Sequence, residues 1–383
     1  MEVNNTVLWL WIKESTQYNN KKTLKLVDYF GSAEEVFDAE SFNQCSFLTD
    51  SEIKTLNRKN LRSAWEIYGE CTENGIEILT LDDEDYPPLL REIENPPSPL
   101  FVKGNLSECL NKPLLTVVGT RKATGYGESM TKKIVTGVCQ CGLSIVCGIA
   151  GGIDTFAIES AIYANSNVIA VLPYGHLANN GYSTKLFADI LVHGAVISEY
   201  FPHKGSHKYA YHERNRILSG LSYGTFIVQA PLKSGALITA NYALEQGREL
   251  FALMANACPE FEGSNNLIKD GCYPVTDYTD IIQVYLPQFH DEINETGTDQ
   301  EQVFSLQQEL TEDQLTAYKK KHGKKLTDDE NTVFQLITTE ECITDYIIEN
   351  AKLPPEQVLQ CLTTLEFRGL IISCPGSKFK IIL

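Results

Sequence analysis

The sequence predicts an α/β protein built on a doubly wound parallel sheet, with a small helical domain before it and a winged-helix domain after it. In the middle of the chain, short β-branched apolar runs alternate with segments of helical period. Two glycine-rich turns each follow an apolar run and precede a helical segment. Near the C-terminus, three helical segments lead into a predicted β-hairpin. We expect domains at 1–75, 76–288 and 326–383, with an acidic linker that ends in a basic tail at 289–325.

The first 75 residues predict a small group of helices. Apolar periodicity indicates helices over Val7–Ile12, Lys22–Phe30, Ala33–Phe37 and Asp50–Tyr68. The step Phe30-Gly31-Ser32 is typical of one helix ending and the next beginning. A module of this kind either binds DNA or packs on a neighbouring domain, and its acidic excess favours packing.

A strand and an acidic, proline-rich segment lead into the central domain. Gly75–Leu81 has β-type composition, and four acidic residues, Asp82–Asp85, follow it. Pro87 and Pro88 then interrupt regular structure. Four consecutive acidic residues cannot all point at one ion, so we interpret the cluster as a solvated loop rather than a metal site.

The stretch 117–154 predicts an anion-binding site. Strands over Leu114–Val118 and Leu143–Cys147 flank one helix and form a βαβ unit. The turns Gly119–Gly127 and Gly148–Gly152 follow these strands, where unpaired backbone N–H groups and the helix dipole favour a phosphate. The first turn lacks both the Gly-Lys-Ser/Thr of a P-loop and the third glycine of the dinucleotide fingerprint. Tight turns without a ligand are the alternative interpretation of these glycines.

Further apolar runs extend the predicted sheet. In a doubly wound sheet, the loops that follow the strands gather at the carboxyl edge, where ligands bind. We therefore expect the loops after Val118, Cys147, Leu172 and Gln229 to form one site. The additional strands are predicted at Val168–Leu172, Ala195–Ser198, Thr225–Gln229 and Leu250–Met254, with a short helix over Lys185–Val192.

The C-terminal residues 326–383 have the pattern of a winged helix but an unusual charge. They hold four Lys and Arg against nine Asp and Glu. A winged helix that binds a phosphate backbone is not expected to be this acidic, so we expect a protein-contacting or regulatory role. The basic run Tyr318–Lys325 before it is expected to be solvated, with a weak electrostatic contact as the alternative.

The distribution of charge decides whether nucleic acid is a plausible partner. The net charge is −18, but residues 112–288 hold 13 Lys and Arg and 13 Asp and Glu, so that 19 basic and 37 acidic residues lie outside.

The 11 cysteines form neither a CxxC pair nor a metal-binding spacing. The apolar run near the N-terminus is too short for a signal peptide or a membrane span. We expect a reduced cytoplasmic protein without metal, cofactor or membrane contact.

Ordered blocks between about Leu79 and Asp280 resemble the bacterial DNA-processing protein A family, also called DprA or Smf. The order of the predicted domains agrees with that family as well. The blocks include Tyr86-Pro-Pro-Leu-Leu, Val118-Gly-Thr-Arg, Gly148-Ile-Ala-Gly-Gly-Ile-Asp, Arg214-Asn-Arg-Ile-Leu-Ser-Gly, Ser234-Gly-Ala-Leu-Ile-Thr-Ala and Glu245-Gln-Gly-Arg.

The resemblance implies an extended Rossmann domain preceded by a SAM-like helical domain. It also implies a non-enzymatic protein that binds single-stranded DNA, protects incoming DNA, dimerises through the Rossmann domain and loads the RecA recombinase during natural transformation. On this basis, turn backbones seat phosphates and nearby cations neutralise them. The expected DNA-binding residues are Gly119, Thr120, Arg121, Lys122, Gly148, Gly151, Gly152, Lys185, Arg214, Asn215, Arg216, Ser234 and Gly235, with Tyr209 and Tyr211 as base-stacking candidates.

Several alternatives stay open. Arg214 and Arg216 can instead pair with Glu199 and Glu213 as a structural network. Gly151 and Ile158 stand where the family commonly carries Arg and His, which predicts weaker DNA contacts.

Two other functions also compete. Related Rossmann enzymes cleave nucleotide N-glycosidic bonds with a glutamate on the helix after a glycine-rich turn, and Glu245 after Lys233–Thr239 is the equivalent here. Their Pro-Gly-Gly and Gly-Thr signature is missing. A protein-binding scaffold would use the acidic flanks and show no DNA affinity.

Overall fold

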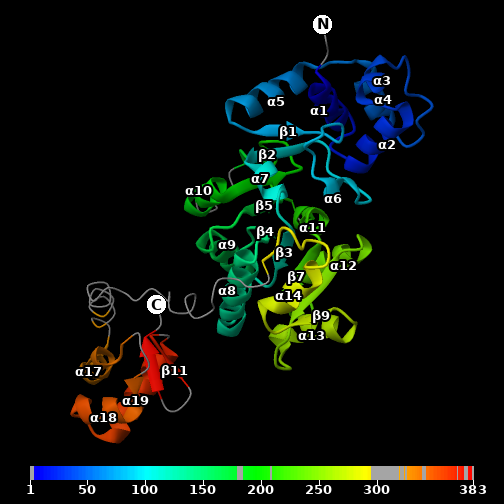
Figure 1. Ribbon diagram of the computed structural model, residues 1–383. Coiled ribbons are helices and arrows are strands. Elements are labelled where there is room, and N and C mark those ends of the chain that lie inside the picture. Colours follow the sequence, from blue (N-terminus) through cyan, green and yellow to red (C-terminus); the bar gives the residue numbers. More distant parts are fainter. Residues whose placement is uncertain are drawn as a thin grey trace. The chain divides into compact units, whose positions relative to one another are not determined.

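The computed structural model describes residues 4–178, 184–207, 209–294, 326–338, 342–368, 370–374 and 378–381, together with residues 319 and 323 (Figure 1). The chain forms two compact units, Met1–Gly297 and Thr298–Leu383. The first unit contains the helical and α/β domains, and the second contains the winged helix. Most of the predicted linker, 289–325, lies outside the described residues.

Five short helices form the N-terminal domain: α1 (Asn5–Ser15), α2 (Asn20–Phe30), α3 (Ala33–Asp38), α4 (Asp50–Asn57) and α5 (Arg62–Glu73). Helix α1 is apolar on nearly every side, and the other helices bury it. The first four helices begin at side chains that accept hydrogen bonds from the first helical turn, namely Asn4, Asn19, Ser32 and Thr49.

The single helix predicted over Asp50–Tyr68 is wrong, because the structure divides it into α4 and α5. Lys59 adopts a φ of 46°, which a right-handed helix cannot continue through. The side chain of Asn60 then accepts a hydrogen bond from the backbone N–H of Arg62 at 3.1 Å, at the start of α5. Apolar periodicity persists across this break, so it does not reveal the left-handed residue.

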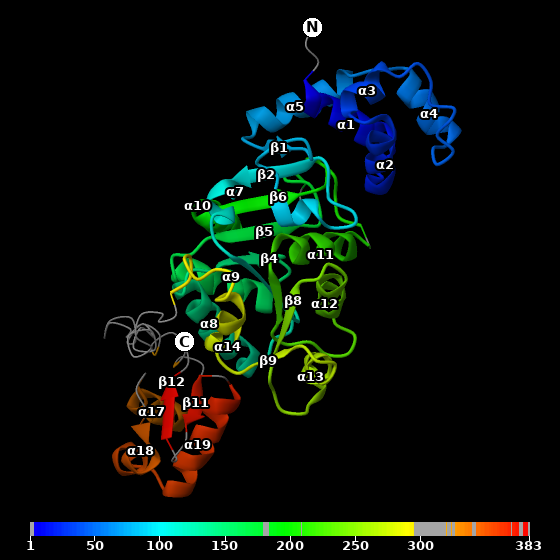
Figure 2. The ribbon, with the colours of Figure 1, turned by 45° about the vertical axis from the view of Figure 1, so that its right-hand side comes forward.

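A nine-stranded sheet forms the centre of the larger unit, in the order β1-β2-β6-β5-β4-β3-β7-β8-β9. Figure 2 shows its first strands in succession next to the helical domain. The strands from β6 to β9 in this order pair in parallel, and the chain proceeds outward in both directions from β3, which confirms the doubly wound prediction. The strands are β1 (Glu77–Leu79), β2 (Leu100–Gly104), β3 (Leu114–Val118), β4 (Ser144–Cys147), β5 (Val168–Leu172), β6 (Gly194–Ser198), β7 (Gly224–Ile227), β8 (Glu249–Leu253) and β9 (Tyr273–Val275).

Strands β2 and β9 were not predicted, because both lie at prolines that argue against regular structure. Pro99 precedes β2, which pairs antiparallel with β1 and β6. Pro274 lies within β9, which is tolerated because β9 is an edge strand with one neighbour. The sheet is therefore mixed, with an antiparallel pair added at one side.

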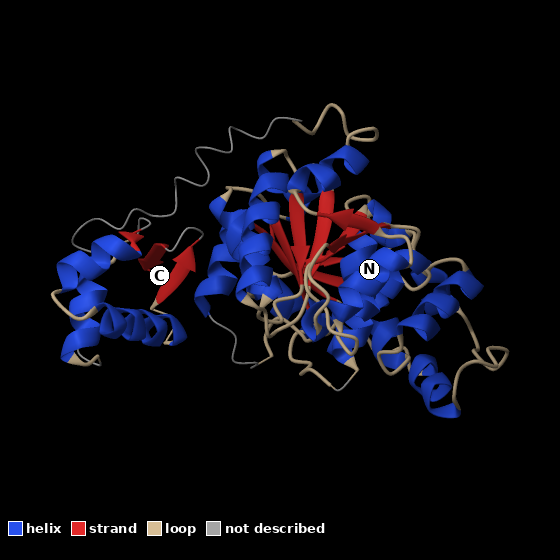
Figure 3. Cartoon of the chain, turned by 90° about the horizontal axis from the view of Figure 1, so that it is seen from below, coloured by secondary structure: helices blue, strands red, loops and turns tan. Residues whose placement is uncertain are grey.

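Helices cover both faces of the sheet (Figure 3). Leu115 and Val117 of β3 belong to the core under one layer, and Leu114 and Val118 belong to the core under the other. The first layer contains α8 (Gly125–Gln140), α9 (Ile153–Tyr163), α10 (Thr184–His193) and α14 (Tyr278–Tyr285). The second contains α6 (Pro88–Arg91), α7 (Leu106–Leu110), α11 (Ala210–Leu221) and α12 (Ala236–Glu245), with α13 (Glu262–Lys269) farther along the chain. The short helix η1 (Pro259–Phe261) before α13 contributes Phe261 to the first core.

The helical domain packs on the β1–β2 side of the sheet. Phe101 of β2 and Phe201 after β6 belong to its hydrophobic core. The indole N–H of Trp9 donates to Asp82 at 2.6 Å, and Asp83 accepts from the backbone N–H of Thr80 at 2.6 Å. Two of the four acidic residues that we predicted to be solvated are therefore structural.

The second unit forms a compact winged helix, as the sequence predicts. Three helices, α17 (Asp328–Leu336), α18 (Thr344–Ala351) and α19 (Pro355–Phe367), pack around an apolar core. An antiparallel sheet of order β10-β12-β11 closes it, formed by β10 (Cys342–Ile343), β11 (Ile371–Cys374) and β12 (Lys378–Ile381). In the basic run before it, Lys319 is buried and donates to the backbone oxygen of Gln335 at 2.7 Å, so this lysine is not solvated as predicted.

Candidate functional site

The two glycine-rich loops and a third loop that ends in Gly235 follow neighbouring strands at the carboxyl edge of the sheet, as the strand order requires. Because β4, β3 and β7 are adjacent, the loops at 148–152, 119–124 and 230–235 follow strands that lie side by side. The backbone N–H of Thr120 donates to the carbonyl oxygen of Gln229 at 2.8 Å, and the N–H of Ile153 donates to the oxygen of Thr120 at 3.2 Å. The first loop is thus hydrogen-bonded to the segments that continue both neighbouring strands.

Close backbone approach explains why two of the predicted positions are glycines. A Cβ atom on Gly119 would lie 2.6 Å from the side chain of Ile153. Gly152 has a φ of 61°, and a Cβ atom there would overlap the carbonyl oxygen of Thr120. The first and second loops therefore pass each other at a distance that only glycine permits.

Helix α11 contacts all three loops through one of its faces. Tyr211, Arg214 and Asn215 are spaced i, i+3 and i+4, so they share that face. The guanidinium of Arg121 in the first loop lies over the ring of Tyr211, with 4.9 Å from its central carbon to the ring centroid. The side-chain amide of Asn215 donates to the oxygen of Gly235 in the third loop at 3.3 Å.

Arg214 supports the second loop from below. Its side chain is only 2% exposed and donates to the carbonyl oxygen of Val171 at 2.6 Å, and a Cβ on Gly148 would overlap the guanidinium. Asp154 accepts a hydrogen bond from the N–H of Ala150 at 3.1 Å. Burial raises the pKa of Asp154, and the positive charge of Arg214 opposes that rise. Arg214 is therefore placed to hold the second loop and not to contact a DNA strand on the surface.

Arg216 lies on the other side of α11, in a buried ion pair. Its guanidinium is 2.6 Å from a carboxylate oxygen of Glu199 and also donates to the carbonyl oxygen of Glu213 at 3.2 Å. Both members of the pair are more than nine-tenths buried. The structure therefore contains the alternative arrangement, in which Arg216 pairs with Glu199 in a structural network.

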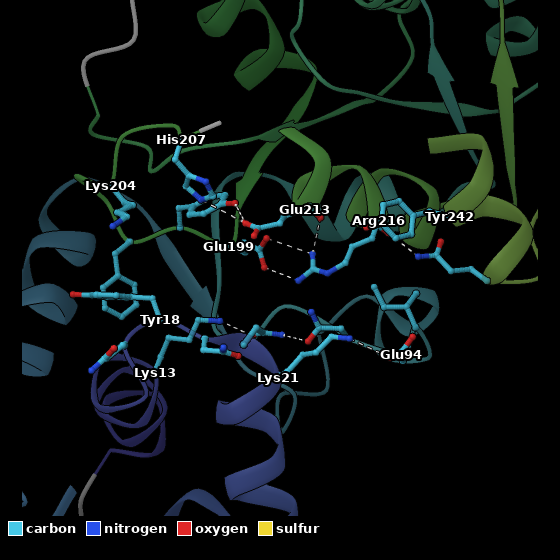
Figure 4. A pocket seen from close by; sticks show the side chains of 18 of the residues that line it. Lys13, Tyr18, Lys21, Glu94, Glu199, Lys204, His207, Glu213, Arg216 and Tyr242 are labelled. Atoms are coloured by element: carbon cyan, nitrogen blue, oxygen red, sulfur yellow. Dashed lines mark hydrogen bonds and ion pairs between the residues drawn. The ribbon is translucent and has the colours of Figure 1, made fainter. Parts of the chain in front are cut away.

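The pair lines a cavity of about 670 Å³ between the helical domain and the α/β domain (Figure 4). Glu199, Glu213 and Arg216 form one wall, and Lys13 lies on the opposite wall, where its ammonium donates to the side-chain oxygen of Asn20. Burial lowers the pKa of Lys13 to about 7. The lining holds four Lys and Arg and five Glu, so the cavity does not select for anions.

The other predicted residues are found on the surface of the same edge or close to it. Arg121 and Lys122 are exposed on the first loop, and Tyr209 is 60% exposed at the start of α11. Lys185 is exposed in the first turn of α10, after the segment 179–183, which lies outside the described residues. Ser234 accepts a hydrogen bond from the N–H of Ala236 at 3.3 Å and so shapes the third loop.

Sequence reasoning missed two residues of this edge. Lys233 is exposed on the third loop, next to Ser234. Gln229 is buried just beyond the end of β7, and its side chain bonds to the first loop. A polar residue at the end of an otherwise apolar strand was the available signal for Gln229.

The residues that the structure describes contain neither a metal-binding cluster nor a membrane-spanning helix. Among these residues, no group of three His, Cys, Asp or Glu side chains is arranged to hold a metal ion. No helix in the described part of the chain combines the length and apolar composition needed to cross a membrane.

Comparison with known proteins shows the family. The model of DNA recombination-mediator protein A matches residues 77–286, and the DprA winged-helix model matches residues 319–377. The chain is 35% identical to the DNA processing protein DprA of Bacillus subtilis over 251 residues, which is 62% of this chain and 84% of that protein. It is 37% identical to Protein Smf of Synechocystis over 223 residues, but this match spans only 56% of that protein's length.

Solved structures agree with this match. DNA processing protein A from Streptococcus pneumoniae is similar with a TM-score of 0.63 and 27% identity, over 74% of this chain and 98% of that one. The Helicobacter pylori protein, solved to describe its single-stranded DNA binding mode, is similar with a TM-score of 0.50 and 27% identity, over 56% of this chain and 97% of that one. With the sequence blocks, the mixed sheet and the winged helix in agreement, the chain belongs to the DNA recombination-mediator protein A family, which includes DprA and Smf proteins.

Proposed function

We propose that the carboxyl edge of the sheet binds single-stranded DNA, and that the protein acts by binding rather than by catalysis. The observation that carries the proposal is Arg121, an exposed cation on a glycine-rich loop, held in place by Tyr211. The similar protein from Helicobacter pylori is described by its single-stranded DNA binding mode. Exposed cations on a preformed loop lower the entropy cost of holding a phosphate.

In this proposal, the residues at the carboxyl edge of the sheet have different roles. Backbone N–H groups of Arg121, Gly151 and Gly235 face phosphates, whereas those of Thr120, Ala150 and Ser234 donate within the protein and only shape the loops. Arg121, Lys122 and Lys185 supply positive charge. Tyr209, which is the more exposed tyrosine, stacks on a base. Tyr211, Arg214 and Asn215 support the loops.

We further propose the finer role that the family resemblance implies. The protein protects incoming DNA and loads the RecA recombinase in natural transformation, as a cytoplasmic homodimer formed through its Rossmann domain. The names of the Bacillus and Streptococcus relatives, both DNA processing proteins, support the DNA-processing part of this proposal. RecA loading is tested by the rate of RecA ATP hydrolysis on strands coated with single-strand-binding protein, which should rise when this protein is added.

A nucleotide hydrolase is the weaker candidate, because of where Glu245 lies. It is the last residue of α12, so the length of the helix, about 15 Å, separates it from the third loop. It lines the cavity between the domains instead. We therefore propose no catalytic role for it.

Fluorescence anisotropy with labelled poly-dT and its duplex, across a range of salt, tests the proposed function. We expect preference for the single strand and an affinity that falls steeply with salt. Arg121→Ala with Lys185→Ala should weaken binding and lower the slope of log affinity against log salt by roughly 1.4, because two phosphate contacts are lost. Lys54→Ala with Arg62→Ala removes the same charge from exposed sites in the helical domain and is the matched control. Equal losses in both double variants would mean that net charge alone drives binding.

A further inference from the structure

Gln229 holds both ends of the first loop, although it lies on a different segment. It follows β7 and is 1% exposed. Its backbone oxygen accepts from Thr120 N at 2.8 Å, and its side-chain Oε1 accepts from the backbone N of Thr124 at 2.9 Å and from the Thr124 hydroxyl at 3.2 Å. One buried residue therefore bonds to the second and the last residues of the loop 119–124.

The same side chain also connects to the start of α8. The hydroxyl oxygen of Thr124 accepts from the N–H of Gly127 at 3.1 Å, which caps the helix. A Cβ atom on Gly127 would overlap Oε1 of Gln229, so glycine is needed for the side chain to reach the loop. Both loop ends are thus bonded to one residue after β7: Thr120 to the backbone oxygen of Gln229, and Thr124, which caps the helix N-terminus where an anion is favoured, to its side-chain amide oxygen.

Arg121 lies between these two attachments. Its guanidinium meets the ring of Tyr211 only if the loop keeps this path. The amide of Gln229 contacts backbone and hydroxyl groups of the loop and none of the cations.

We propose that Gln229 is a positioning residue for the phosphate-binding loop: it sets the path of residues 119–124, and thereby the placement of Arg121, without contacting the nucleic acid. The proposal rests on the proposed function of the edge and adds a residue that acts through the loop. Loss of the Oε1 acceptor would leave the Thr124 N–H without its partner inside the protein, which favours other loop conformations.

Two substitutions separate the acceptor from the rest of the side chain. Gln229→Leu keeps the size and removes the acceptor, and we expect single-stranded DNA affinity to fall about tenfold, as for the loss of one good hydrogen bond. Gln229→Glu keeps an acceptor at the same reach, next to a helix N-terminus that favours a carboxylate, and should retain most of the affinity. Thr225 lies in β7, the strand that leads to Gln229, and its buried hydroxyl has no hydrogen-bond partner. Thr225→Val is therefore the matched control and should bind as wild type.

A double-mutant cycle with Arg121→Ala distinguishes positioning from a general loss of stability. If Gln229 acts by placing Arg121, the penalty of Gln229→Leu shrinks when Arg121 is already alanine. Fully additive penalties would overturn the proposal, and so would wild-type affinity of the Leu variant. Should the Leu variant fail to fold, Thr124→Ala replaces it. This variant removes the hydroxyl donor to Oε1 together with the cap of α8, and keeps the backbone donor. A loss smaller than tenfold that also shrinks without Arg121 supports the proposal.

Hydrogen exchange of the Thr124 amide separates this proposal from the proposed function. The amide should exchange faster in Gln229→Leu than in wild type and in Gln229→Glu, in the absence of DNA. If the wild-type protein binds no DNA, the proposed function is refuted, and the exchange rates alone decide whether Gln229 orders the loop. Unchanged exchange in the Leu variant would overturn the positioning role whatever the DNA result.

Discussion

The guanidinium carbon of Arg121 lies 4.9 Å from the ring centroid of Tyr211, which joins the first glycine-rich loop to helix α11. The contact crosses 90 positions of sequence and places an exposed cation at the carboxyl edge of the sheet. Cation–π contacts of this kind are worth about 0.5–1 kcal/mol at exposed sites, enough to favour one side-chain position over others.

Replacing Tyr211 should therefore weaken DNA binding through Arg121. We expect Tyr211→Ala to lower single-stranded DNA affinity by about 1 kcal/mol, while Tyr211→Phe keeps the ring and binds as wild type. Anisotropy titration measures both. Tyr163→Ala, an exposed tyrosine at the far end of α9, is the control. A loss in the Phe variant equal to that in the Ala variant would contradict a role for the ring.

The buried pair of Arg216 and Glu199 should matter for stability and not for DNA contact. Arg216→Met leaves Glu199 buried without its partner, and we expect the free energy of unfolding to fall by about 3 kcal/mol. Replacing both, Arg216→Met with Glu199→Leu, should cost less, because no buried charge is left unpaired. Urea unfolding measures stability, and anisotropy of the folded variants should show wild-type affinity. A loss of DNA affinity in a variant that is still folded would instead indicate that Arg216 contacts DNA.

Acid should destabilise the larger unit through His176. Burial lowers the pKa of His176 to about 4, and its Nε2 lies 3.1 Å from the carbonyl oxygen of Phe101. In the unfolded chain the imidazole takes up a proton near pH 6.5, whereas in the folded protein it stays neutral down to about pH 4. The contribution of His176 to the free energy of unfolding is therefore complete above pH 6.5 and is lost as the pH falls toward 4. Between pH 7 and pH 5 we expect a loss of about 2 kcal/mol.

The comparison with His176→Gln isolates that contribution from other titrating groups. The wild-type protein should lose more unfolding free energy than the variant between pH 7 and pH 5 in urea titrations. His203→Gln, which removes an exposed histidine paired with Glu70, serves as the control. Parallel pH profiles for wild type and His176→Gln would refute the assignment.

The proposed dimer should depend on the edge strand β9 and on the residue that follows its neighbour β8. Tyr273 of β9 and Met254 after β8 are exposed, and edge strands readily pair with other chains. Met254→Lys with Tyr273→Lys should shift the protein toward a monomer in sedimentation velocity, and Val192→Lys on α10 should not. An unchanged dimer in the double variant would place the interface elsewhere.

Much of the fold could be predicted because it depends on local pattern. Apolar β-branched runs at 114–118, 143–147 and 168–172 indicated strands that the structure contains as β3, β4 and β5. Local pattern failed where one residue changes the backbone, as at Lys59, or where proline masks a strand, as at β2 and β9.

The positions of the loops in the candidate site could be predicted from the sequence, but the roles of the individual residues could not. The order of strands brings the glycine-rich turns together, so their positions followed from the βα pattern. The different roles of the two arginines of α11 could not be predicted. Arg214 and Arg216 are the same residue type on either side of Asn215, yet one supports Gly148 and the other pairs with Glu199. Helical spacing places them on different sides of the helix, but it does not say what each side meets.

The sequence by itself therefore determined the doubly wound domain, its flanking modules, the family and the glycine-rich turns, since these follow from periodicity, turn chemistry and ordered motifs. Only the tertiary structure decided which polar residues are buried and what they hold. Gln229 reaches Thr124 across 105 positions, and Arg121 meets Tyr211 across 90, because the sheet places β3, β7 and α11 together. Such contacts depend on how distant elements are placed relative to one another, and no local sequence pattern predicts that placement.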